Sequence, residues 1–105
     1  MEKTLVINEK EHKFRVSAAT TYLYRDMFGK DLIRAFQRVE EGVDDESVTL
    51  MTQLAYVAAR QGDPKAPPIE EWLEQFGTGD LLRVIIPCVA DLWKKNVKAT
   101  VSPKK

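Results

Sequence analysis

The sequence is short of the residues that build most catalytic and metal sites. Its 105 residues include one cysteine, Cys88, and one histidine, His12. A single cysteine forms no disulfide within the chain, and the apolar neighbours of Cys88 favour burial over the basic, partly open setting that activates a thiol. A lone histidine leaves no partner nearby in sequence for a zinc site or a nucleophilic pair. We therefore expect no enzyme activity, no metal and no cofactor.

The chain also lacks net charge and long hydrophobic runs. Sixteen basic residues balance sixteen acidic ones, so no overall positive field is available to hold nucleic acid or an anionic membrane. The longest apolar runs, such as 84–90, fall far below the ~20 residues that cross a bilayer, and the first residues lack the order of a signal peptide. These absences predict a cytoplasmic protein that binds neither nucleic acid nor membrane.

The composition that remains is enough for one small domain. A length of 105 residues matches the common size of a single domain. Contents of 44% hydrophobic and 30% charged residues are those of a folded chain rather than a disordered one. We expect residues 1–97 to form this domain and residues 98–105 to form a flexible basic tail.

Residues 3–16 predict a β-hairpin. The segments 4–7 and 13–16 are rich in residues that favour strands, and the polar residues 8–11 between them suit a turn. Phe14 and Val16 alternate with charged residues, so we expect both side chains to face a core. His12, between charged neighbours, should be an exposed strand residue. Since two strands alone are marginally stable, helices must cover one face of the hairpin.

Apolar residues spaced three and four apart predict about five helices after the hairpin. Ser17 suits the N-cap of the first helix, Gly29 suits its end, and Asp44 or Asp45 can cap the third. The expected helical segments are 17–28, 31–42, 45–61, 69–76 and 80–97. The predicted fold is mainly α (α+β), an N-terminal β-hairpin followed by about five helices in a small compact bundle.

Glycine and proline interrupt the second half of the chain. Residues 62–68 hold three prolines and form the clearest loop. The Gly77-Thr78-Gly79 segment lacks the lysine and the preceding strand of a phosphate-binding loop, so we expect a turn between helices. Pro87 lies inside the most apolar helical segment, where a proline removes a backbone hydrogen bond and costs about 3 kcal/mol. A kink or a break is expected there.

Charges of opposite sign gather in two parts of the chain. The acidic cluster consists of Glu40, Glu41, Asp44, Asp45 and Glu46. It lacks the ligand spacing of a calcium loop, so a solvated turn is expected. The last twelve residues hold five lysines and no acid. Contacts between such patches on neighbouring copies predict a homo-oligomer that is held by charge and weakened by salt.

Three large aromatic residues are candidates for partner contact: Trp72, Phe76 and Trp93. Trp72 and Phe76 lie four residues apart, between the proline-rich loop and the Gly-Thr-Gly turn. Side chains of this size either fill a core or anchor an interface, and the sequence leaves both interpretations open. If they anchor an interface, the short helix 69–76 is a mobile clamp for a partner.

Three segments, read in order, resemble one known family. Residues 24–32 follow the pattern Tyr-Arg-x-x-Phe-Gly-x-Asp-Leu, residues 54–61 read Leu-Ala-Tyr-Val-Ala-Ala-Arg-Gln, and residues 70–73 read Glu-Glu-Trp-Leu. Placed after a hairpin, they resemble the tail assembly chaperones of long-tailed, siphovirus-type phages and prophages of Gram-positive bacteria. The similarity runs over about residues 4–93.

This resemblance implies a non-enzymatic function. Such chaperones bind the very long tape measure protein and keep its apolar helices soluble until tail tube subunits polymerise around it, and they are absent from the mature virion. The resemblance thus implies the tape measure protein as partner, the tail tube protein as a second candidate, and the host cell cytoplasm as location. No cofactor is needed.

Two other function classes remain as alternatives. The first is a small helical DNA-binding transcription regulator that uses lysines of the segment 94–105, although the zero net charge counts against it. The second is a small enzyme, which the lack of a catalytic cluster makes the weakest of the three.

Overall fold

The hairpin and the helices follow one another in the order that the sequence predicts. The computed structural model describes residues 1–40 and 45–98. Its elements are β1 (Glu2–Ile7), β2 (Lys10–Arg15), α1 (Ala19–Phe28), α2 (Leu32–Glu40), α3 (Asp45–Gly62), α4 (Ile69–Leu73), α5 (Thr78–Asp80), a π-helical turn (Leu81–Ile85) and α6 (Ile86–Asn96). The predicted α+β fold, a hairpin followed by helices, is confirmed.

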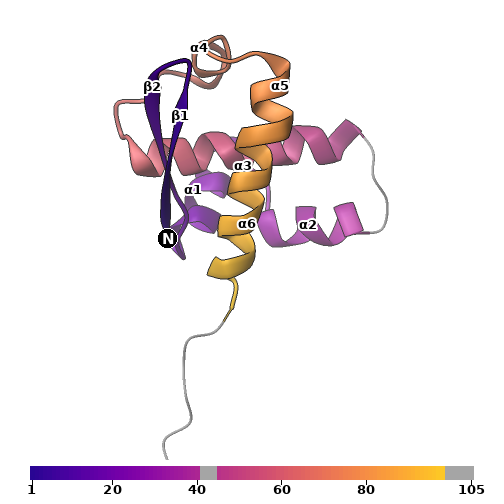
Figure 1. Ribbon diagram of the computed structural model, residues 1–105. Coiled ribbons are helices and arrows are strands. Elements are labelled where there is room, and N and C mark those ends of the chain that lie inside the picture. Colours follow the sequence, from indigo (N-terminus) through magenta and orange to yellow (C-terminus); the bar gives the residue numbers. More distant parts are fainter. Residues whose placement is uncertain (41–44, 99–105) are drawn as a thin grey trace, which may run out of the picture.

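α3 is the central element of the fold. The hairpin and the run from α5 to α6 lie side by side, and both cross α3 (Figure 1). α1 and α2 also pack on α3. Six consecutive α3 residues, Leu54–Ala59, are at most 6% exposed, so the middle of this helix is covered on every side. Three of the six are alanines, whose small side chains let the neighbouring elements come close.

The hairpin closes through a two-residue turn. Ile7 pairs with Lys10 across the turn, and the two turn residues, Asn8 and Glu9, have φ values of 52° and 65°. Positive φ at both positions is typical of the type I′ turn, whose twist matches that of the strands it joins. The turn is therefore shorter than the predicted segment 8–11, and both strands are longer than predicted.

β2 packs closely on the end of α3. Phe14 and Val16 are fully buried, which confirms the predicted inward face of this strand. A Cβ atom at Gly62 would lie 2.3 Å from the carbonyl oxygen of Lys13. Gly62 therefore does more than end α3, because its missing side chain leaves room for the strand.

Local hydrogen bonds fix two helix starts and one helix end near the predicted residues. Gly29 follows α1 with a φ of 67° and donates its N–H back to that helix. The Asp31 carboxylate accepts a hydrogen bond from the Arg34 N–H (3.1 Å) at the start of α2. The Ser17 hydroxyl accepts one from the Ala19 N–H (3.2 Å), although α1 itself begins two residues after Ser17.

In place of a kink or break at Pro87, the chain forms a π-helical turn just before it. The helical run continues from Thr78 to Asn96, with Pro87 in the first turn of α6. Proline offers no N–H to the carbonyl four residues earlier, and its ring crowds that group. The wider π turn accommodates this without ending the helix. The run begins earlier than predicted because the Asp80 carboxylate accepts the Gly77 N–H (3.0 Å).

Two predicted charged segments fall largely outside the structure. Residues 41–44 of the acidic cluster and residues 99–105 of the basic tail lie outside the described residues.

α4 is shorter than the predicted segment 69–76. None of the helices in the ranges 1–40 and 45–98 is long and apolar enough to cross a bilayer.

Candidate functional site

α4 packs the side chain of Trp72 into the core. Two acidic residues lie in its first turn, where carboxylates interact favourably with the positive end of a helix. Trp72 is only 2% exposed. Its ring meets those of Phe14, Tyr56 and Phe76 in edge-on contacts, with centroids 6.3, 5.6 and 5.1 Å away. In this conformation almost none of the Trp72 side chain is exposed to a partner.

Phe76 lies at the rim of the same aromatic cluster. Its side chain is partly buried, and its ring contacts that of His12 edge-on at 4.9 Å. His12 is therefore partly buried, and the prediction of an exposed strand residue is wrong, because the turn after α4 covers it. Burial and, to a lesser extent, the Lys10 ammonium lower the pKa of His12. The neutral imidazole is the form that this contact favours.

Trp93 belongs to a different cluster. It is 8% exposed on α6 and stacks on Phe36 of α2, with ring centroids 5.4 Å apart and planes inclined by 9°. The structure thus brings Trp72 and Phe76 together and gives Trp93 its own ring partner. Their role in partner binding stays a prediction, and of the three only Phe76 offers a partly accessible ring.

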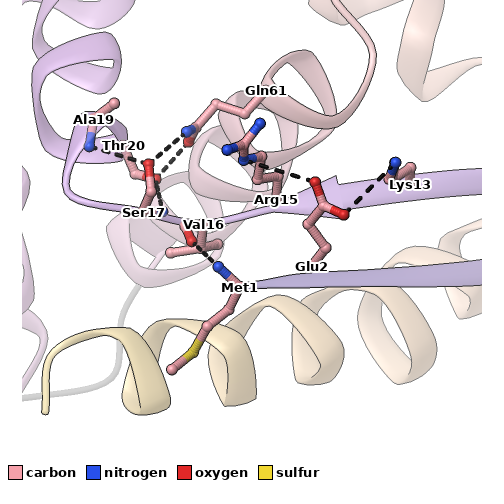
Figure 2. Close-up of polar contacts among 9 residues, drawn as sticks. All are labelled: Met1, Glu2, Lys13, Arg15, Val16, Ser17, Ala19, Thr20 and Gln61. Carbon is pink, nitrogen blue, oxygen red and sulfur yellow. Dashed lines mark hydrogen bonds and ion pairs between the residues drawn. The ribbon is translucent and has the colours of Figure 1, made fainter. Parts of the chain in front are cut away.

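Polar contacts hold the base of the hairpin to the end of α3 (Figure 2). Gln61 donates from Nε2 to the Ser17 hydroxyl (3.1 Å) and accepts at Oε1 from the Thr20 hydroxyl (2.5 Å). The N-terminal ammonium group of Met1 donates to the Val16 carbonyl (2.7 Å), and the Val16 N–H donates to the Met1 carbonyl (2.8 Å). The corner between β2 and α1 is therefore anchored on the same end of α3 that Gln61 occupies.

The loop after α3 leaves a hollow beside β2. Tyr56 donates its hydroxyl hydrogen to the Pro67 carbonyl (2.7 Å), and the Asp63 N–H donates to the Ala59 carbonyl of α3 (2.8 Å), so both ends of the loop are bonded to α3. Within the loop, the Asp63 carboxylate accepts the Lys65 N–H (3.0 Å). The hollow has a volume of about 330 Å³, at the lower end of the range for ligand sites. Its walls come from β2, the end of α3, the loop and α4, and Trp72 is among the lining residues.

The hollow could not be found from local sequence patterns, because its walls are distant in the chain. Lys10 donates from Nζ to the side-chain oxygen of Gln75 (3.2 Å), a residue 65 positions away. No short motif joins these two residues. The three prolines of residues 62–68 predict a loop, but they do not indicate which elements the loop packs against.

The candidate reactive groups are potential metal ligands and the one cysteine. No group of three or more potential metal ligands occurs in the ranges 1–40 and 45–98. Cys88 is a buried free thiol, and burial is the main cause that raises its pKa. A thiol that stays protonated is a poor nucleophile. The hollow and the rim of the aromatic cluster are the candidate binding surface. Comparisons with models of known protein families, with curated proteins and with solved structures found no match to this chain.

Proposed function

We propose that this chain is a tail assembly chaperone of a long-tailed phage or prophage, which binds the tape measure protein and keeps it soluble until the tail tube polymerises around it. The observation that carries the proposal is where the family-like segments lie in the fold. Residues 24–32 span the corner between α1 and α2, including the glycine that ends one helix and the aspartate that caps the next. Residues 70–73 fall within α4, which carries Trp72.

Exposed apolar side chains give such a protein something to bind with. Tyr22 on α1 is 74% exposed, Ile33 on α2 is 49% exposed, and Leu82 and Val84 in the π-helical turn are 44% and 41% exposed. A tape measure protein rich in amphipathic helices needs cover for its apolar faces before the tube exists. Many weak apolar contacts from several copies would provide that cover and still permit release.

Co-expression with a tape measure fragment tests the proposal. The proposal predicts a long open reading frame for a tape measure protein next to this chain's own gene, and a fragment of that protein is produced in bacteria with and without the chain. We expect the chain to raise the soluble share of the fragment several-fold and to co-purify with it. The measurement is the amount of fragment in the supernatant and in the complex after size-exclusion chromatography.

Two controls make the result specific. An unrelated helical protein of similar size, expressed at the same level, should leave the fragment insoluble. The double variant Tyr22→Asp with Ile33→Asp changes only exposed positions, so it should fold normally and lose part of the effect. A fragment that stays equally insoluble with and without the chain contradicts the proposed function.

A further inference from the structure

The backbone of β2 directs its hydrogen-bonding groups alternately to its two sides. Val16 donates its N–H to the Met1 carbonyl and accepts at its own carbonyl from the Met1 ammonium group, and in an antiparallel pair such bonded residues alternate with unbonded ones. Every second residue back from Val16 therefore bonds to β1. The residues between them, Glu11, Lys13 and Arg15, point their N–H and carbonyl groups away from β1.

Helices cover one edge of the two-stranded sheet and part of the other. α6 contacts β1 and runs along the side of β1 opposite β2 in both views (Figures 1 and 2), so no further strand fits there. On the other edge, the end of α3 at Gly62 meets the carbonyl of Lys13. At Glu11 the edge instead borders the hollow. Within the described part of the chain, no residue bonds to the N–H or the carbonyl of Glu11.

Two ammonium groups at the hollow have no carboxylate partner among the described residues. These belong to Lys10 and Lys65. Lys13 lies 3.6 Å from the Glu2 carboxylate on the outer face of the hairpin (Figure 2). The Asp63 carboxylate accepts the Lys65 backbone N–H. Lys10 donates one hydrogen bond to the neutral Gln75 side chain, so a negative group that entered the hollow would meet two cations that no described carboxylate neutralises.

We propose that this hollow binds a short, extended, acidic peptide segment of a partner protein by strand addition at Glu11. One residue of the segment exchanges both backbone hydrogen bonds with Glu11. Side chains alternate along a strand, so the residues on either side of it face inward, on the same face as Lys10. Carboxylates at those two positions reach the ammonium groups of Lys10 and Lys65. The inference stands apart from the chaperone function, and either could fail alone.

A titration of the full ¹⁵N-labelled chain tests the proposal. The probe is the peptide Gly-Glu-Thr-Glu-Gly, acetylated and amidated at its ends. Binding should shift the amide signal of Glu11 and slow its hydrogen exchange at least tenfold at saturation, because a new hydrogen bond protects it. Weak affinity is expected, with Kd on the order of 1 mM. A probe that leaves the Glu11 amide unchanged overturns the proposal.

Two comparison peptides separate strand addition from simple charge attraction. A peptide with lysine in place of both glutamates should bind at least tenfold more weakly. A peptide with an N-methyl group on the central threonine keeps the charge and loses one backbone donor, so it should also bind much more weakly. Equal binding of the lysine peptide removes the acidic preference. Equal binding of the methylated peptide removes strand addition.

Charge-reversal variants locate the site. Lys10→Glu and Lys65→Glu should each raise Kd for the acidic peptide about tenfold, since each replaces an attraction by a repulsion. Lys30→Glu is the matched control, because Lys30 is exposed and lies in the connection between α1 and α2. It should change Kd less than twofold. Equal losses in all three variants would show that the peptide follows the overall charge, and the site would be wrong.

Discussion

Gly62 has no room for a side chain, because β2 crosses the end of α3 at that residue. We expect Gly62→Ala to lower the free energy of unfolding by about 1–3 kcal/mol, the usual cost of forcing extra atoms into a packed contact. The carbonyl that a Cβ would meet belongs to the backbone of Lys13, which cannot rotate away as a side chain can. Urea unfolding followed by circular dichroism measures the change.

Gly79 provides the matched control for this prediction. It lies in α5, and a Cβ added there would meet nothing within 4 Å. Gly79→Ala should therefore leave stability unchanged or raise it by up to about 1 kcal/mol, since alanine favours a helix more than glycine does. Equal losses in both variants would show that the close contact with Lys13 is not the cause.

His12 links stability to pH. Its pKa in the folded chain lies below the ordinary value of 6.5, so folding favours the neutral imidazole. The resulting stability is fully present above pH 6.5 and is lost as the pH falls through the folded-state pKa. We expect the urea midpoint of the wild type to fall more between about pH 7.5 and about pH 5 than that of His12→Gln. Identical pH profiles would contradict this linkage.

At the scale of elements, α4 carries a buried ring, Trp72, and the turn after it carries a partly buried one, Phe76. Trp72→Ala should lower the free energy of unfolding by about 3–5 kcal/mol, the usual cost of deleting a large core aromatic. Phe76→Ala should cost less, about 1–2 kcal/mol, because its ring is only partly buried. Thermal unfolding of both variants, compared with the conservative Trp72→Phe, measures the difference.

The same two variants decide whether α4 acts as a clamp. If Trp72→Ala stays as stable as the wild type and loses only capture of a tape measure fragment, the ring is a mobile anchor and its core position is not essential. The buried position of Trp72 instead favours a role in holding α4 against β2. Phe76 is then the member of the pair that a partner can reach.

Helix ends could be predicted because the signals are local. Gly29 and Asp31 act within one or two turns of their own position, so the sequence alone revealed the corner between α1 and α2. The π-helical turn could not be predicted, because a helix can also accommodate a proline by a kink or a break. The hollow could not be predicted for another reason. Its lining residues, such as Lys10 and Gln75, meet only after the hairpin, α3 and α4 have packed together.

At the scale of the whole molecule, we predict self-association through charge. Lys94 and Lys98 are exposed near the end of α6, while Lys95 is paired with Asp91 at 3.0 Å. The oppositely charged segment, 40–46, lies largely outside the described residues. Sedimentation at low ionic strength should show an oligomer that dissociates in ~1 M salt, where the screening length is ~3 Å.

Variants make this prediction specific to the end of α6. Lys94→Glu combined with Lys98→Glu should reduce the sedimenting mass at low ionic strength, whereas Lys30→Glu should not. A monomer under all conditions would contradict self-association. An oligomer that persists in high salt would point to the exposed apolar side chains, Tyr22 and Ile33 among them, as the contact.

The π-helical turn changes the phase of the last helical run. A turn of this kind holds one residue more than an α-helical turn, and one residue corresponds to about 100° of rotation. The segments before and after it are therefore out of step. Ile85, Val89 and Leu92 are spaced four and three residues apart, share one side of the run after this turn, and lie buried in the core. Removing one residue from Leu81–Ile85 would restore a regular helix and rotate α5 by about 100° about the axis of α6. The extra residue thus sets which way α5 faces while α6 stays packed on the core.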